Sequence, residues 1–286
     1  MENGKRISVR HGYVVERFRQ GEGPSETVDV LPGGRMAGLA LGYRGYRTDR
    51  GGSALLRVIP ATRVLLDISL EAPPQVLGSG PVPSVALFGM RTAPTRLSRS
   101  DGLGIVVELP PHVAYSVLGA VNDTMLDGAD LLGGRAGNLV EGLAAAPGWR
   151  ERMALLDDTL AAWRAAGPVA SPRVVWAWRR LCRTGGRLPI GRLADEVGWT
   201  RRNLLTRFRA QIGVSPKAAG RVIRFDRALR LLRREPPLPL SAVAQIAGYS
   251  DQPHLTREFR SLAGGTPAEL AGRRSHSFKT ARDSSG

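Results

Sequence analysis

The most regular pattern of apolar and polar positions lies between residues 190 and 270, where one helical signal occurs twice. In each copy, apolar residues recur three and four positions apart, a glycine follows, and a second run with helical spacing begins shortly after it. The copies are 50 residues apart at Leu193 and Val243 but 51 apart at Phe208 and Phe259, so the second copy contains one additional residue. Each copy therefore predicts two helices joined by a tight turn.

Each predicted turn contains a glycine, an aromatic residue and a hydroxyl residue. Gly198 and Gly248 supply the permissive backbone that a tight turn needs, and Thr200 and Ser250 are predicted to cap the helices that follow. The residue after each glycine is aromatic, and we expect it to pack against the turn rather than touch a ligand: Trp199 in the first copy and Tyr249 in the second.

The second helix of each copy separates apolar from basic positions. At 100° per residue, Leu204 and Phe208 face inward in the first copy, as do Leu255 and Phe259 in the second. A short helix with an arginine-rich outer face after a glycine turn is typical of a helix-turn-helix, whose second helix enters the DNA major groove, where arginine can pair with guanine. Solvated surface arginines are the alternative, but their repetition at matched positions favours DNA. The outward positions are Arg202, Thr206 and Arg209, and then Pro253, Arg257 and Arg260.

A third helix is predicted between the copies, from Pro216 to Glu235, before the stop signal of two prolines. At 1.5 Å per residue it would be about 30 Å long, close to the roughly 34 Å between successive major-groove faces. One chain could then place two recognition helices in adjacent grooves. The arginines along this helix are candidate phosphate contacts: Arg221, Arg224, Arg227, Arg230, Arg233 and Arg234.

These units resemble the AraC/XylS transcription regulators over residues 172 to 274. The resemblance rests on Leu193-Ala194, Gly198-Trp199-Thr200, Leu204, Arg207-Phe208, Gly213-Val214-Ser215-Pro216, Gly248-Tyr249-Ser250-Asp251-Gln252, His254, Arg257, Phe259 and Thr266-Pro267. It implies a seven-helix DNA-binding domain in a bacterial, cytoplasmic protein. His254 could contact a base edge or help to pack the turn. The candidate DNA-binding residues are Arg201, Arg202, Leu205, Thr206, Arg209, Gln252, Pro253, His254, Thr256, Arg257 and Arg260.

The first half of the chain has a different pattern. Between residues 53 and 109, short β-branched or aliphatic runs are separated by proline and glycine turns, which favours an antiparallel sheet, sandwich or small barrel. Residues 1 to 50 predict only edge strands and loops. The resemblance implies a cupin-like barrel that binds a small effector. The predicted strands are Leu55 to Ile59, Val64 to Leu70, Ser84 to Phe88 and Gly104 to Leu109.

Helical spacing returns beyond Pro110-Pro111. Short helices are predicted at residues 112 to 118 and 138 to 145, a loop at 122 to 137, and an amphipathic helix at 149 to 165. We expect the apolar stripe of that last helix, formed by Leu155, Leu156, Leu160 and Trp163, to pack on its own sheet, with a dimer interface as the alternative. The whole is an α+β chain: a β-rich domain ending in helices (1–166), a linker (167–172), an all-α domain with two helix-turn-helix units (173–274) and a disordered tail (275–286).

Charge follows the repeated units. The chain of 286 residues has a net charge of +16, and residues 173 to 274 contain 21 basic and 7 acidic residues, a net charge of +14. Such a balance indicates a polyanionic partner for this half alone. A membrane partner is not expected, because the sequence has no apolar run of 18 residues and no signal peptide.

The sequence contains few residues with the spacing that catalysis or metal binding requires. Cys182 is the single cysteine, which fits a reducing cytoplasm, and we expect it on the buried face of the first helix of the DNA-binding domain, with a redox sensor as the alternative. The four histidines, His11, His112, His254 and His276, lack ligand spacing, so neither a metal nor another cofactor is expected. No nucleophile elbow or nucleotide loop is present, and the chain is not expected to be an enzyme.

These patterns together predict a sequence-specific DNA-binding transcription regulator whose β-rich domain senses an effector, mediates dimer formation, or both. Double-stranded DNA is the expected partner, with a small-molecule effector and a second copy of the chain as further candidates, and RNA polymerase if the protein is an activator. The alternatives are an effector-independent regulator whose first domain only contacts other proteins and, with less support, an enzyme tethered to DNA.

Overall fold

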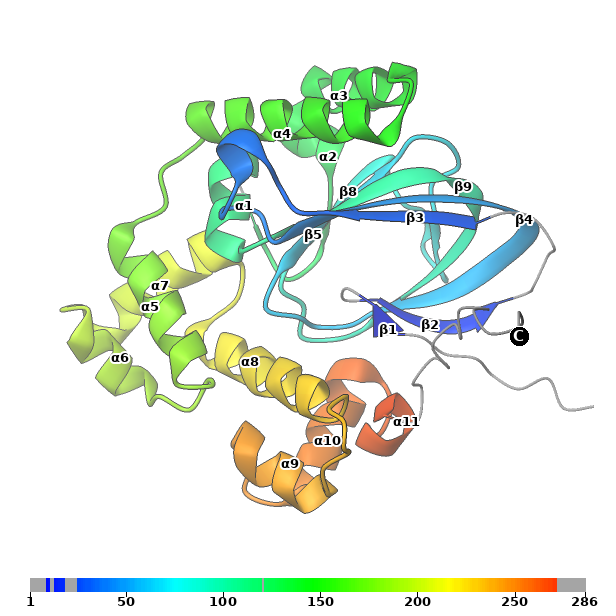
Figure 1. The fold of residues 1–286 in the computed structure, drawn as a ribbon. Coiled ribbons are helices and arrows are strands. Elements are labelled where there is room, and N and C mark those ends of the chain that lie inside the picture. The colour runs from blue at the N-terminus through cyan, green and yellow to red at the C-terminus, as the bar shows by residue number, and fades with distance from the viewer. Residues whose placement is uncertain (1–8, 11–12, 19–24, 120, 272–286) are drawn as a thin grey trace, which may run out of the picture.

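The computed structural model describes residues 9–10, 13–18, 25–119 and 121–271, and it divides into a β-rich N-terminal region and a helical C-terminal region (Figure 1). This arrangement confirms the predicted fold class. The disordered tail predicted for residues 275 to 286 lies outside the described residues, as does part of the segment 1 to 24.

All pairings in the sheet are antiparallel. The main path runs β1-β2-β4-β9-β5-β8-β10, with β3 beside β4, and β6 between β9 and β7. The strands are β1 (Val9–Arg10), β2 (Tyr13–Phe18), β3 (Ser25–Val30), β4 (Gly42–Val58), β5 (Val64–Ser69), β6 (Gln75–Val76), β7 (Gly80–Pro81), β8 (Val85–Phe88), β9 (Thr95–Leu109) and β10 (Met125–Asp127).

The two long strands form the centre of this sheet. β4 pairs with β9 along most of its length, and its register shifts between Thr48 and Ser53, where its other partner changes from β3 to β2. The prediction of edge strands and loops for residues 1 to 50 was therefore wrong from Gly42 onward. Arginines and glycines interrupt the apolar alternation there, which hid a central strand from periodicity alone.

The described part of the N-terminal region contains four α-helices, preceded by a short 3-10 turn, η1 (Gly34–Met36). They are α1 (Pro111–Leu118), α2 (Gly128–Leu132), α3 (Gly134–Ala145) and α4 (Trp149–Ala166). On α4, Leu156, Leu160 and Trp163 join the apolar core of one sheet face, as predicted, whereas Leu155 stays 37% exposed. The other face of the sheet carries a second, smaller apolar cluster.

The loop predicted at residues 122 to 137 was wrong, because β10, α2 and the start of α3 occupy this segment. Asp127 caps α2, since its side chain accepts a hydrogen bond of 2.7 Å from the backbone N–H of Ala129. Leu132 is buried in the main core. The cap and the buried leucine stabilise α2, whose five residues are too few to show helical periodicity in the sequence.

The C-terminal region consists of seven helices within the described residues, as the family resemblance implied: α5 (Pro172–Arg183), α6 (Ile190–Glu196), α7 (Arg201–Ile212), α8 (Pro216–Leu231), α9 (Leu240–Ala247), α10 (Gln252–Ala263) and α11 (Pro267–Ala271). They surround two separate apolar cores. α8 supplies Val222 and Ile223 to the first core, and Phe225 and Leu229 to the second.

The linking helix α8 is shorter than predicted. It ends at Leu231 rather than Glu235, so at 1.5 Å per residue its 16 residues span about 24 Å. The next residues form tighter turns, in which the N–H groups of Arg233 and Arg234 donate to carbonyls three positions back. The proline at 236 disfavours a helical conformation only for Glu235, directly before it, so it does not account for the end of α8 at Leu231.

Packing of α4 on the sheet depends on one glycine. A Cβ atom at Gly45 of β4 would lie 2.3 Å from the ring of Trp149, the first residue of α4. We therefore expect Gly45→Ala to lower the free energy of unfolding by about 1 to 3 kcal/mol, the usual cost of overpacking. Urea denaturation of the full chain measures this effect.

Gly42→Ala on the same strand is the matched control, because a Cβ atom at this glycine would have no neighbouring heavy atom within 4 Å. Equal stability losses for the two variants would show that Trp149 does not restrict position 45.

Candidate nucleic-acid interface

Each helix-turn-helix unit is built around a glycine in left-handed conformation. Gly198 (φ +67°) separates α6 from α7, and Gly248 (φ +94°) separates α9 from α10. Only glycine adopts this conformation without strain, so it fixes the sharp reversal between the helices. The turn aromatics pack as predicted: Tyr249 is buried in the second core, and Trp199 lies against the first.

The helix caps correct one prediction. Thr200 caps α7, since its Oγ1 accepts a hydrogen bond of 3.2 Å from the N–H of Asn203. In α10, however, Asp251 is the cap, accepting at 2.6 Å from the N–H of His254, while Ser250 donates to the Asp251 carboxylate. Ser250 is thus the additional residue of the second unit. The amide of His254 and then the Ser250 hydroxyl hold the pKa of Asp251 below its usual value.

The outer faces of α7 and α10 are open to solvent. All eleven candidate DNA-binding residues are at least partly exposed while the N-terminal region is in place. Those fully classed as exposed are Arg201, Arg202, Leu205, Thr206, Arg209, Gln252, Pro253, Arg257 and Arg260, and the half-buried ones are His254 and Thr256. The inward positions of both helices have no exposed surface: Leu204, Phe208 and Ile212, and Leu255, Phe259 and Leu262.

The face of α10 is hollowed. A depression of about 470 Å³ is lined by Gln252, Pro253, Thr256, Arg257 and Arg260. Their equivalents 51 residues earlier are Arg201, Arg202, Leu205, Thr206 and Arg209, which form the exposed face of α7. We call these two sets the reading faces.

The arginines of α8 have partners within the protein. The guanidinium of Arg221 donates to Glu258 of α10 at 2.8 and 3.0 Å, and Arg224 donates to the carbonyl of Gly186 at 2.7 Å. Arg230 pairs with Asp226 at 3.0 Å. The first two contacts join α8 to α10 and to the loop after α5, whereas the third lies within α8. Contact of this arginine row with phosphates stays a prediction.

The N-terminal region touches the two units at equivalent points. Gly213 and Gly264, 51 residues apart, end α7 and α10 in left-handed conformation. A Cβ at Gly213 would lie 3.1 Å from the backbone of Asn122, and one at Gly264 would lie 3.4 Å from Nη1 of Arg57. Arg57 also donates at 2.5 Å to the carbonyl of Ala263. Both recognition helices therefore end against the N-terminal region.

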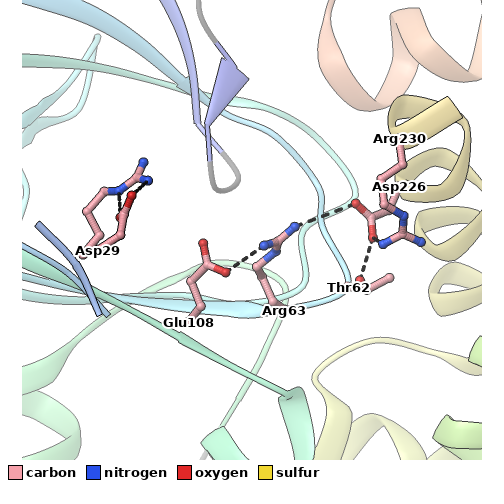
Figure 2. A network of polar contacts seen from close by, with 7 residues as sticks. Asp29, Thr62, Arg63, Glu108, Asp226 and Arg230 are labelled. Atoms are coloured by element: carbon pink, nitrogen blue, oxygen red, sulfur yellow. Dashed lines mark hydrogen bonds and ion pairs between the residues drawn. The ribbon is translucent and has the colours of Figure 1, made fainter. Parts of the chain in front are cut away.

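A third junction lies at the middle of α8 (Figure 2). Thr62 Oγ1 donates to Asp226 Oδ2 at 2.7 Å, and Nη2 of Arg63 lies 4.0 Å from Asp226 Oδ1. The other end of the same guanidinium donates at 2.7 Å to Glu108 of β9. Asp226 and Glu108 are only 4% and 6% exposed, so the chain of charges connects the sheet to the linking helix through the interior.

Apolar contacts reinforce these junctions. Ile59, from the loop between β4 and β5, is buried in the second core, and Met90, after β8, is buried in the first. The sequence reasoning did not find this interface. One available signal was Asp226 itself, a carboxylate among Val222, Phe225 and Leu229 on the apolar face of α8, where a buried charge requires a partner.

Cys182 differs from its prediction, because its side chain reaches the surface of α5 instead of the buried face. It borders a depression of about 510 Å³ that is lined by Trp176, Trp178, Arg179 and Arg183. Partial removal of the thiol from water, and then the negative charge of Asp226, raises the pKa of Cys182 to about 12, which keeps the thiol protonated at neutral pH.

His112, in the first turn of α1, is another titratable group with a shifted pKa. Burial, then the charge of Arg179, lowers the pKa of His112 to about 4. Within the described ranges, no group of three or more histidine, cysteine, aspartate or glutamate residues is arranged to hold a metal ion. Among the same residues, no helix has the length and apolar character needed to cross a membrane.

Two helix-turn-helix units that present equivalent, basic outer faces define a double helix-turn-helix DNA-binding domain. The family model described as "Helix-turn-helix domain" matches residues 193–273. This part of the chain is a helix-turn-helix domain of the AraC type, which confirms the resemblance drawn from the sequence.

Several solved structures are similar to the chain. The xylose-binding transcription activator XylR is 23% identical, with 36% of this chain and 27% of that chain covered and a TM-score of 0.34. The C-terminal domain of AraT, a response regulator from Geobacillus stearothermophilus, is 23% identical, with coverage of 40% and 95% and a TM-score of 0.36. ToxT from Vibrio cholerae is 10% identical, with coverage of 81% and 97% and a TM-score of 0.46. No curated protein matches the chain.

The Thr200 cap allows a direct test of how α7 is held. Thr200→Ala should lower the free energy of unfolding by about 1 kcal/mol, because the N–H of Asn203 loses its acceptor. Thr200→Ser keeps a hydroxyl at this position and should retain most of the stability. Denaturant titrations of the two variants and the parent measure the difference, and an alanine variant as stable as the parent would exclude the capping role.

Proposed function

We propose that this AraC-type transcription regulator binds a specific DNA duplex by placing α7 and α10 in adjacent major-groove segments. The observation that carries the proposal is the doubled reading face, in which equivalent positions of both units reach the surface. The net charge of +14 over residues 173 to 274 supplies the attraction to phosphates.

α8 links the two units and contributes to both apolar cores, which fixes the position of α7 relative to α10 (Figure 1). Its 16 residues span about 24 Å, less than the roughly 34 Å between successive major-groove faces on one side of B-DNA, so in this proposal the packing of each unit against α8 supplies the remaining separation.

The residue types on the reading faces supply base recognition. Arginine can pair bidentately with guanine, and glutamine with adenine, so Arg202, Arg257 and Gln252 have the required chemistry. His254 and Thr256 lie at the edge of the α10 face. Arg201, Arg209 and Arg260 extend both faces, where guanidinium groups reach bases or phosphates.

The N-terminal region, in this proposal, regulates how the two reading faces are held relative to each other. Three junctions support this role: Asn122 at the end of α7, Arg57 at the end of α10, and Thr62 with Arg63 at Asp226 of α8. A ligand that alters the sheet would change DNA affinity through Glu108 and these contacts, because any ligand with different affinities for two arrangements shifts their populations.

On the strength of the AraC-type resemblance, we also propose three partners besides DNA. They are a small-molecule effector on the N-terminal region, a second copy of the chain, and RNA polymerase for an activator. We place the protein in the bacterial cytoplasm, where the DNA target and a reduced Cys182 are both expected.

Selection of bound duplexes from a random library tests the function, and Arg257→Ala tests base reading. The variant should lose roughly 1 to 3 kcal/mol of binding free energy on the selected duplex and relax discrimination at one base pair. Fluorescence anisotropy with the selected and a random duplex measures both effects.

Arg164→Ala, an exposed change on α4 of the N-terminal region, is the matched control and should leave both affinities unchanged. An equal loss on selected and random duplexes for Arg257→Ala would contradict base reading and leave only phosphate binding.

The junction at Asp226 is testable by a double-mutant cycle with Thr62→Val and Asp226→Ala. The hydroxyl donates to a buried carboxylate, so we expect a coupling free energy of roughly 1.5 to 3 kcal/mol for this pair. Urea unfolding of the four proteins gives the value. Additive effects, or separate unfolding of the two regions in the parent chain, would show that the junction does not join them.

A further inference from the structure

Leu205 is an exposed apolar residue at the centre of the α7 reading face, among arginines. Leu205 is 46% exposed, whereas Leu204, Phe208 and Ile212 of the same helix are completely buried. It therefore contributes part of its side chain to the surface rather than to the core. Its helical neighbours one turn away are Arg201, Arg202 and Arg209, so this apolar surface lies within a basic face.

The equivalent residue in the second unit also lies on a reading face. Thr256, 51 residues later, lines the depression on α10 together with Gln252 and Arg257. Its hydroxyl donates at 3.0 Å to the carbonyl of Gln252 within the helix. That bond occupies its donor proton, so the adjacent glutamine and arginine are better suited to direct hydrogen bonding with bases.

We infer that Leu205 is a specificity-determining residue by which α7 detects the 5-methyl group of a thymine. This inference rests on the proposed function, since it requires α7 to enter the major groove. In that groove thymine alone among the four bases presents a methyl group, and apolar side chains recognise it. A leucine has no donor or acceptor, so contact with the methyl group is the chemistry open to it.

The two units then read different chemistry. The first combines an apolar contact at Leu205 with the guanidinium groups of Arg201 and Arg202, whereas the second relies on hydrogen bonds from Gln252 and Arg257. The bound sequence should consequently be asymmetric, with dependence on a thymine methyl in the segment that α7 occupies.

Replacement of thymine by deoxyuridine tests the inference, because it removes the methyl group and leaves the hydrogen-bonding edge intact. On the duplex selected from a random library, each thymine is replaced singly and the affinity of the full chain is measured. At one position we expect about four-fold weaker binding, the factor that corresponds to removal of one buried methyl group. Leu205→Ala should bind the thymine and uracil duplexes equally at that position.

Two further variants make the result specific. Leu205→Met keeps an apolar side chain of similar volume and should retain the uracil effect. Leu155→Ala removes an exposed leucine from α4 and should also retain it. Matching thermal unfolding of parent and Leu205→Ala, expected for a half-exposed side chain, shows that the fold is intact.

The outcomes separate the inference from the proposed function. If the parent selects a sequence but no single uracil weakens binding, or if Leu205→Ala keeps the parent's uracil sensitivity, the role of Leu205 is wrong while DNA recognition stands. If no sequence is enriched and Arg257→Ala affects all duplexes alike, the proposed function itself fails.

Discussion

The sharing of α8 between two apolar cores is the constraint on which the C-terminal region depends. Val222 and Ile223 pack in the first unit, and Phe225, only a few residues later, packs against Phe259 of α10 with tilted rings whose centroids are 4.7 Å apart. Neither unit can rotate about the linking helix without exposing buried surface. The ion pair between Arg221 and Glu258 also fixes the orientation of α10 on α8. The spacing of α7 and α10 is therefore set by packing against α8 and not by a flexible linker.

The N-terminal region adds a second constraint. It meets α7 and α10 at glycines in corresponding positions, Gly213 and Gly264, and it meets the middle of α8 at Asp226. The candidate DNA-binding residues stay exposed while these contacts are made. In the proposed function, the N-terminal region can therefore influence DNA binding without covering them. The regulation that we propose would act through the relative orientation of the two units, since small shifts at packed interfaces are amplified into discrete rearrangements.

Sequence reasoning succeeded where information is local and periodic. The repeat placed the turn glycines, the buried positions such as Phe208 and the outward positions such as Arg257, because helix geometry converts spacing into direction. It failed at Ser250, which was predicted to cap α10. The cap is Asp251, because its side chain reaches the free N–H of His254 at the start of that helix. It also missed that Gly45 lies in a central strand, where its lack of a side chain makes room for Trp149.

The sequence by itself determined the two helix-turn-helix units, their reading faces and the basic charge that accompanies them. Only the tertiary structure decided that β4 and β9 form the centre of the sheet, that α8 stops at Leu231, and that Thr62 meets Asp226 across 164 positions of the chain. The physical reason is that a helix depends on residues three and four positions apart, which the sequence shows directly. Strand pairs and buried ion pairs join residues far apart in the chain, and no local pattern indicates which residues will meet.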